Sequence, residues 1–250
     1  MIKRALLFNL ALLPIALVAG YFVIAYQIDI YSEDILAEAV AQLGSVDVLI
    51  AVGIAQTVMY TAFCGFFGYI LAGKLGLWKP FEFDKSKLLV TFIVSLAGGV
   101  VFSLDHWTFG GIIDGIKEAN AASLTANGII ASILYGGVIE EVMMRLFFMS
   151  LVAFIIWKLF FRNSDSDDIP TAVFVIANVI AVLLFAAGHL PATLSLFGEL
   201  TPLILVRCFL LNGGFGLIFG ELYRRYGIVY AMMSHALFHI VSKVIWIIFI

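Results

Sequence analysis

Two adjacent glutamates and an arginine stand in the otherwise uncharged, apolar stretch 136-GGVIEEVMMRLFFMS-150. Glu141 and Arg145 are four residues apart with the glutamate first, the favourable order for an ion pair on one helix face. Glu140 is rotated by about 100° from Glu141 on an α-helix, so it need not share that arginine. The spacing predicts one carboxylate that is neutralised and a second that points elsewhere. A purely structural ion pair would show the same spacing.

Histidines occur in two later apolar stretches. His189 ends the first, and His235 and His239 are four residues apart in the second, where they share one helix face. Ionisable side chains inside a membrane cost at least about 2.5–3.5 kcal/mol each, so a cluster of them points to function. A carboxylate shielded from bulk water can draw a proton from a bound water molecule, and imidazoles can hold that water or donate to an oxyanion. We therefore expect Glu140, His189 and His235 to meet in one hydrated pocket that is suited to hydrolysis.

The composition is that of an integral membrane protein. Of the 250 residues, 63% are apolar and 12% are charged, whereas a soluble domain carries about 25% charged residues. A helix needs roughly 20 apolar residues to cross the bilayer. The apolar runs do not alternate with polar residues as the strands of a membrane barrel would, so the spans must be helical.

Seven apolar runs are long enough to span a bilayer, at about 5–26, 46–73, 88–104, 128–160, 171–190, 200–222 and 228–250. The first run continues to Tyr26 without a small-residue cleavage site, which predicts a retained span rather than a signal peptide. Segments 30–44 and 109–123 are predicted to lie in the interface. We expect an all-α transmembrane bundle of seven or eight spans around an intramembrane cavity. It forms one domain over 1–250, with N-terminal spans in 1–127 and the chemical core in 128–250.

Basic residues alternate between the connections. Ten of the fourteen Lys and Arg residues lie in 1–4, 74–87, 158–162 and 224–225. The only Lys or Arg in the intervening connections is Lys117; these connections are 27–45, 105–127 and 191–199. Because cytoplasmic loops are enriched in Lys and Arg, this pattern predicts a cytoplasmic N-terminus and a C-terminus on the other side.

Several functions are disfavoured by the sequence. A net charge of −3, with no basic tail and no Gly-rich phosphate loop, argues against a nucleic-acid partner. Cys64 and Cys208 lie in separate apolar runs and are predicted to be small core residues. Arg207 and Lys243 are predicted either to pair with a carboxylate or to extend toward the interface, without an assigned role.

Three motifs, taken together, resemble those of the CPBP family of intramembrane proteases, which includes Abi proteins and CAAX endopeptidases. The stretch 140-EEVMMR-145 matches its E-E-x-x-x-R motif, and 185-FAAGH-189 matches F-x-x-x-H. The stretch 235-HALFH-239 resembles the third motif, usually H-x-x-x-N, and 216–239 resembles the approach to it. The resemblance covers roughly 128–245 and implies peptide-bond hydrolysis inside a helical membrane fold.

Site roles follow from that resemblance. It implies that Glu140 activates water, that Glu141 and Arg145 support it, and that His189 and His235 position the water or stabilise the oxyanion. His239 replaces the usual asparagine; a neutral imidazole can also donate one hydrogen bond if its tautomer is correct. A helix-packing histidine is the alternative for this position.

The expected partners are a peptide or membrane-protein substrate and the lipid bilayer. The resemblance points to prenylated CAAX tails or to small peptides without selecting between them. It also suggests a cavity open to the cytoplasm, whereas the charge pattern places Glu140 and His189 toward the outer half of their spans. The preferred mechanism needs no cofactor. Zinc remains an alternative because Glu and His are zinc ligands, although no H-E-x-x-H occurs.

Two other functions remain open. An ion- or proton-coupled transporter would also need intramembrane ionisable residues, although the charges do not recur in two matching halves. A catalytically silent scaffold or immunity member of the same family is the other alternative.

Overall fold

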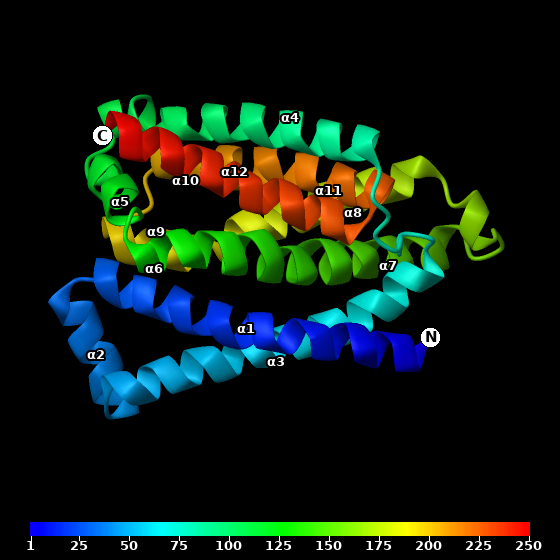
Figure 1. Cartoon of the computed structure of the whole chain (residues 1–250), viewed down its shortest axis with the longest axis horizontal. Helices are drawn as coiled ribbons and strands as arrows, with labels where there is room; N and C mark the ends of the chain where they lie inside the picture. Colours follow the sequence, from blue (N-terminus) through cyan, green and yellow to red (C-terminus); the bar gives the residue numbers. More distant parts are fainter.

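The computed structural model describes residues 1–250 and consists of helices and loops, without a β-strand. Seven helical segments are long and apolar enough to cross a membrane: Ile2–Ile30, Val46–Lys74, Lys85–Gly111, Ala126–Phe160, Thr171–Phe197, Pro202–Tyr226 and Ile228–Phe249. The predicted seven-span, all-α fold is confirmed. The two termini lie at opposite ends of the bundle, as an odd number of spans requires (Figure 1).

The first two spans form one edge of the bundle. Helices α1 (Ile2–Ile30) and α3 (Val46–Lys74) lie side by side (Figure 1). A Cβ atom on Gly20 of α1 would come within 2.9 Å of the Ile54 backbone, so the two helices approach closely at a small residue. Between them, α2 (Glu33–Leu43) begins at the Ser32 cap and buries none of its residues. The segment 30–44, which is predicted to lie in the interface, thus contains a helix with no buried residues between the first two spans.

The fourth span is one continuous helix at the centre of the molecule. It is built from α6 (Ala126–Ala131), η3 (Ser132–Glu140), η4 (Val142–Met149) and α7 (Ser150–Phe160). The regular α-helix assumed from the sequence is wrong here. Both η3 and η4 are π-helical, with hydrogen bonds between residues five apart, a geometry that is rare and often found at functional sites. Leu146 and Met149 pack into the main hydrophobic core.

The last span is held against two neighbouring helices. In α12 (Ile228–Phe249), Ser234 Oγ lies 3.0 Å from Ser95 Oγ of α4 (Lys85–Ser103). The chain enters α12 from α11 (Gly214–Tyr226) through Gly227, whose φ of 97° suits a residue without a Cβ atom. Helix α11 in turn contacts α8 (Thr171–Gly188), where Asn178 Nδ2 donates to the Leu217 carbonyl at 2.9 Å.

Short helices gather at the end of the bundle that holds the C-terminus. They are η1 (Leu104–His106), η2 (Phe109–Gly111), α5 (Ile116–Ala122) and α9 (Leu190–Phe197). The sixth span begins at this end with α10 (Pro202–Cys208) and continues through the π-helical η6 (Phe209–Gly213) into α11. At the opposite end, η5 (Ser166–Asp168) lies in the polar linker between α7 and α8. The predicted break between spans five and six lies at 198–201, and α8 also ends just before His189.

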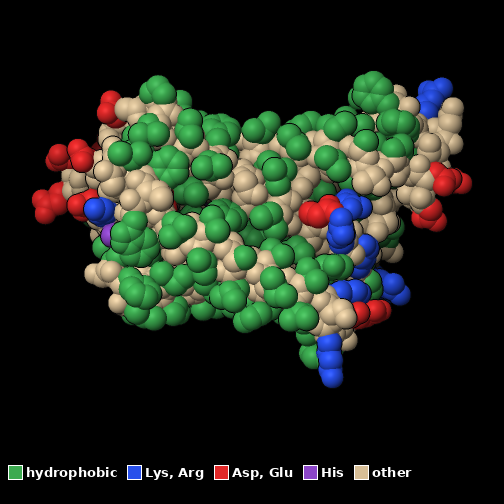
Figure 2. Space-filling view, turned by 90° about the horizontal axis from the view of Figure 1, so that it is seen from above, with side chains coloured by type: hydrophobic (Ala, Val, Ile, Leu, Met, Phe, Trp, Pro, Cys, Tyr) green, Lys and Arg blue, Asp and Glu red, His purple; other side chains and the backbone are tan.

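The surface has a broad hydrophobic band between two polar ends (Figure 2). Its exposed side chains include Leu89, Phe92 and Ile93 of α4 and Leu183 of α8. Large apolar side chains on the outside of a helical bundle are suited to contact with lipid. The protein is an integral, multi-pass membrane protein.

Candidate active site

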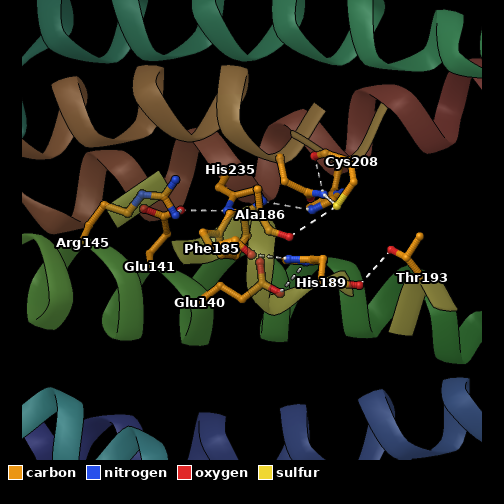
Figure 3. A network of polar contacts seen from close by, with 11 residues as sticks. Glu140, Glu141, Arg145, Phe185, Ala186, His189, Thr193, Cys208 and His235 are labelled. Atoms are coloured by element: carbon orange, nitrogen blue, oxygen red, sulfur yellow. Dashed lines mark hydrogen bonds and ion pairs between the residues drawn. The ribbon is translucent and has the colours of Figure 1, made fainter. Parts of the chain in front are cut away.

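The predicted convergence of three helices is observed. Glu140 at the end of η3, His189 at the junction of α8 and α9, and His235 and His239 on α12 all line one cavity of about 240 Å³. In Figure 3, Glu141 lies between Arg145 and His235, and Glu140 points toward His189. The side chains come from segments separated by up to 99 residues, from Glu140 to His239, so only the tertiary fold brings them together.

Two glycines of η3 let α12 approach closely enough for this. A Cβ atom on Gly137 would lie 2.7 Å from the Ala236 Cβ and 2.8 Å from its Cα. A Cβ atom on Gly136 would lie 3.0 Å from His239 Nε2 and 3.9 Å from Glu140 Oε2. Any larger residue at either position would press on the helix that carries the histidines.

Glu141 is the buried centre of a charged network. Its side chain has no exposed surface, and its Oε1 lies 3.0 Å from Arg145 Nη1 and 2.8 Å from His235 Nδ1. The ion pair predicted from the i, i+4 spacing is therefore present. Arg145 Nη2 also donates to the Gly216 carbonyl at 3.0 Å, which ties the fourth span to α11.

Aromatic rings enclose this network. The Arg145 guanidinium lies 5.2 Å from the Phe185 ring centre and 5.7 Å from that of Phe219. Phe219 also stacks on His235, with ring centres 4.4 Å apart and an interplanar angle of 20°. Cation–π contacts of this kind strengthen when water is excluded. The guanidinium and the His235 ring are therefore held in fixed positions.

The hydrogen bonds determine the imidazole tautomers. A carboxylate can only accept, so His235 must carry its proton on Nδ1. Its Nε2 lies 3.1 Å from His239 Nε2. A neutral His235 then accepts at Nε2, and His239 donates from its own Nε2. This gives a relay from Glu141 through His235 to His239, while His239 Nδ1 has no hydrogen-bond partner.

Glu140 differs from Glu141 in its surroundings. Its side chain is 16% exposed, and its Oε1 lies 3.9 Å from His189 Nε2, too far for a direct hydrogen bond. His189 Nδ1 is 2.9 Å from the Phe185 carbonyl, to which it must donate. In the neutral ring Nε2 is therefore an acceptor that faces another acceptor. A water molecule that donates one proton to each atom would satisfy both.

Comparison with known families fits this arrangement. Residues 122–241 match the family described as type II CAAX prenyl endopeptidase Rce1-like, a range that includes Glu140, Glu141, Arg145 and the three cavity histidines. The matched range is just under half of the chain, and it supports the resemblance to the CPBP family of CAAX proteases. The family that it matches has CAAX-type intramembrane endopeptidase activity. Comparison with the curated proteins and with the solved structures found no match.

The chain departs from the family's third motif at His239. Its Nε2 is occupied by His235, so this position does not present a free donor to the cavity. Asn212 of η6 does line the cavity, and its Nδ2 donates to the Cys208 carbonyl at 3.0 Å. The motifs missed Asn212 and also Tyr135, which lines the same cavity. An asparagine in an apolar span was the available signal.

A second cavity of about 710 Å³ shares Glu140, His189 and Asn212 with the first and widens away from them. Its lining is mostly hydrophobic. Arg207 lies in its wall and forms a two-pronged ion pair with Asp105, at 2.8 and 2.7 Å. Lys243, the other cation without an assigned role, is buried and donates to Ser123 Oγ at 2.5 Å. The small cavity is therefore the deep end of a larger apolar one.

The residues with zinc-ligand chemistry do not form a metal site. No group of three or more His, Cys, Asp or Glu side chains is placed so that it could hold one ion. His235 and His239 face each other, while His189 turns Nε2 toward Glu140. A tetrahedral zinc needs at least three protein ligands around one point.

Proposed function

We propose that this protein is an intramembrane endopeptidase in which Glu140 activates water for attack on a peptide bond. The contrast between the two glutamates carries the proposal. Glu141 is fully buried and shared by Arg145 and His235, whereas Glu140 faces the cavity and lies 3.9 Å from His189 Nε2. Only Glu140 has a carboxylate oxygen near a position where water would be held by a second group.

The proposed reaction moves one proton out and back. A water molecule held between Glu140 Oε1 and His189 Nε2 attacks the carbonyl carbon of the substrate as its proton passes to Glu140. This forms a tetrahedral intermediate with the negative charge on the former carbonyl oxygen. The C–N bond then breaks, and Glu140 returns the proton to the leaving amine, which restores the carboxylate.

Asn212 is the proposed donor to the oxyanion. The Asn212 amide group carries two protons. One is donated to the Cys208 carbonyl at 3.0 Å, and the other faces the Cys208 sulfur, a weak acceptor, at 3.5 Å. This amide supplies the chemistry that the family places at the position of His239. Glu141, Arg145 and His239 act as positioning residues because they hold His235 rather than the substrate.

The expected substrate is a membrane-associated peptide. The larger cavity leads to Glu140 through a mostly hydrophobic wall, which suits a peptide with apolar side chains near the bond that is cut. Prenylated CAAX tails and small unmodified peptides are the two classes to compare, and the family match alone does not choose between them.

Cleavage of a peptide library by the purified protein tests the proposal. Glu140→Gln should lower kcat by about 10²–10⁴-fold, the usual contribution of a general base. Glu199→Gln, an exposed acid outside both cavities, is the matched control and should cleave like the wild type. Circular dichroism and gel filtration should show that both variants fold.

The same assay separates the alternatives. Chelator treatment should leave the rate unchanged, and a loss of activity that zinc restores would contradict the metal-free mechanism. A Glu140→Gln variant with wild-type cleavage would overturn the proposed role of Glu140. A folded wild type that cuts no member of the library, prenylated or not, would favour a silent scaffold.

A further inference from the structure

The outer part of the active-site cavity reaches one end of the bundle. This part is lined by the last turn of α1, including Gln27 and Tyr31, and by α9, including Thr193 and Leu196. These elements lie at the end that also holds the C-terminus (Figure 1). No residue of either cavity comes from the turns near the N-terminus, from the 75–84 connection or from the 161–170 linker.

The opposite side of Glu140 is closed by packed side chains. Immediately beyond it, Glu141 and Arg145 are 0% and 1% exposed and form an ion pair. Below them, Leu146 and Met149 are buried in the main hydrophobic core. Farther along the span, Ser150 Oγ lies 2.8 Å from Tyr223 OH, and both residues are fully buried. Met143, Met144 and Phe148 line the larger cavity on this side, but no residue of the basic loops does, so a peptide from the basic end would have to pass the packed core.

The closed end carries the basic loops. Ten of the fourteen Lys and Arg residues flank this end: Lys3, Arg4, Lys74, Lys79, Lys85, Lys87, Lys158, Arg162, Arg224 and Arg225. Several are fixed there, since Lys79 Nζ donates to the carbonyls of Arg224 and Arg225 at 2.8 and 2.7 Å. In Figure 2 most of the Lys and Arg side chains gather at this end.

The cations on the mouth side do not change this asymmetry. Arg207 is paired with Asp105, and Lys243 is buried within the bundle. Lys117 is then the single Lys or Arg of the loops at the mouth, which also carry Glu33, Asp114 and Glu199. Because the bias of Lys and Arg in short loops sets orientation, the closed end is the cytoplasmic one.

We propose that the cavity opens away from the cytoplasm, so that the site receives extracytoplasmic segments of membrane-associated peptides rather than cytoplasmic CAAX tails. The orientation rests on the charges and the shape of the cavity alone. The substrate class rests in addition on the proposed peptidase function. Cytoplasmic prenylated tails would meet the packed, basic face, which has no opening to Glu140.

Cysteine labelling in intact cells tests the orientation. Ala192→Cys places a thiol on an exposed residue of the mouth, and Asn163→Cys places one in the exposed linker at the basic end. Wild-type protein, in which Cys64 and Cys208 are buried, provides the background. A membrane-impermeant maleimide should label Ala192→Cys in intact cells and Asn163→Cys only after permeabilisation.

The reverse pattern would overturn the inference, and so would the absence of label on Ala192→Cys under both conditions, because the mouth would then be closed. A second measurement addresses the substrate. A peptide that the purified protein cuts is inserted beside a transmembrane anchor, on either its outer or its cytoplasmic side. Only the outer version should be cut in cells, and Glu140→Gln should abolish this.

These results separate the two proposals. Cleavage only of the cytoplasmic version would overturn the orientation while leaving the peptidase function intact. Correct labelling with no cleavage of any peptide by the purified protein would leave the orientation in place and remove the function.

Discussion

His235 donates from Nδ1 to the same Glu141 oxygen that pairs with Arg145, at 2.8 Å and 3.0 Å respectively. One buried carboxylate therefore fixes both a cation of its own helix and an imidazole of the last span. Its second oxygen, Oε2, has no hydrogen-bond partner. Glu141 therefore holds Arg145 and His235 in position, and Glu140 is the carboxylate that faces the cavity.

Removing one partner of the Glu141–Arg145 ion pair should destabilise the protein. Glu141→Leu leaves a buried, uncompensated guanidinium and should lower the free energy of unfolding by about 3–5 kcal/mol. The double variant Glu141→Leu/Arg145→Leu should recover most of that loss but not the cleavage rate, because His235 still lacks its acceptor. Thermal unfolding and peptide cleavage measure the two effects. A double variant that is no more stable than the single one would show that the charges are not coupled.

Replacing His239 distinguishes a positioning role from a packing role. Asparagine can donate to His235 Nε2 as His239 does, so His239→Asn should keep the cleavage rate within about tenfold. His239→Leu keeps the bulk but removes the donor, and should slow cleavage by about 10–100-fold, the cost of one unpaired buried group. The pH profile of kcat should move for the leucine variant alone. Equal rates for both variants would indicate a packing residue.

Asn212 should act on the transition state rather than on substrate binding. Asn212→Ala removes the proposed oxyanion donor and should lower kcat by about 10²-fold with little change in KM. Asn163→Ala, in the exposed linker outside both cavities, serves as the control. A rise in KM at constant kcat would instead assign Asn212 to substrate binding.

Gly137 should be intolerant of a side chain because of the helix that it faces. Gly137→Ala inserts a methyl group 2.7 Å from the Ala236 Cβ and should cost about 1–3 kcal/mol of stability while moving His235 and His239 away from Glu141. Gly214→Ala is matched, since a Cβ atom there meets nothing within 4 Å. Unfolding and cleavage should both change for the first variant and neither for the second.

The spans, and Glu140, His189 and His235 as candidate site residues, could be predicted from the sequence because local signals mark each of them. Hydropathy over about 20 residues reports bilayer length, and charges within apolar runs are rare enough to be noticed. The contact between Gly137 and Ala236 could not be predicted, because it depends on the crossing of two helices 99 residues apart in sequence. Asn212 could not be assigned to the site for a similar reason, since its neighbours in the cavity come from other spans.

Assigning the side of the membrane to which the cavity opens required both the sequence and the structure. Loop charges indicate which end faces the cytoplasm, but only the packed side chains around Leu146 and Met149 show that this end is closed. The charge pattern places Glu140 toward the outer half of its span, and the structure places it with His235 in one cavity inside the bundle.

The wide backbone turns of η3 and η4 make the fourth span sensitive to its length as well as to its composition. A π-helical turn accommodates more residues than an α-helical one. Removing a single residue between 132 and 149 would let the helix tighten. Every side chain after the deletion would then rotate about the helix axis and point in a new direction. Glu140 or Arg145 would then turn away from its partners although neither had been mutated. Away from the two tightly packed glycines and the charged residues, substitution should therefore be tolerated along this segment far more readily than insertion or deletion.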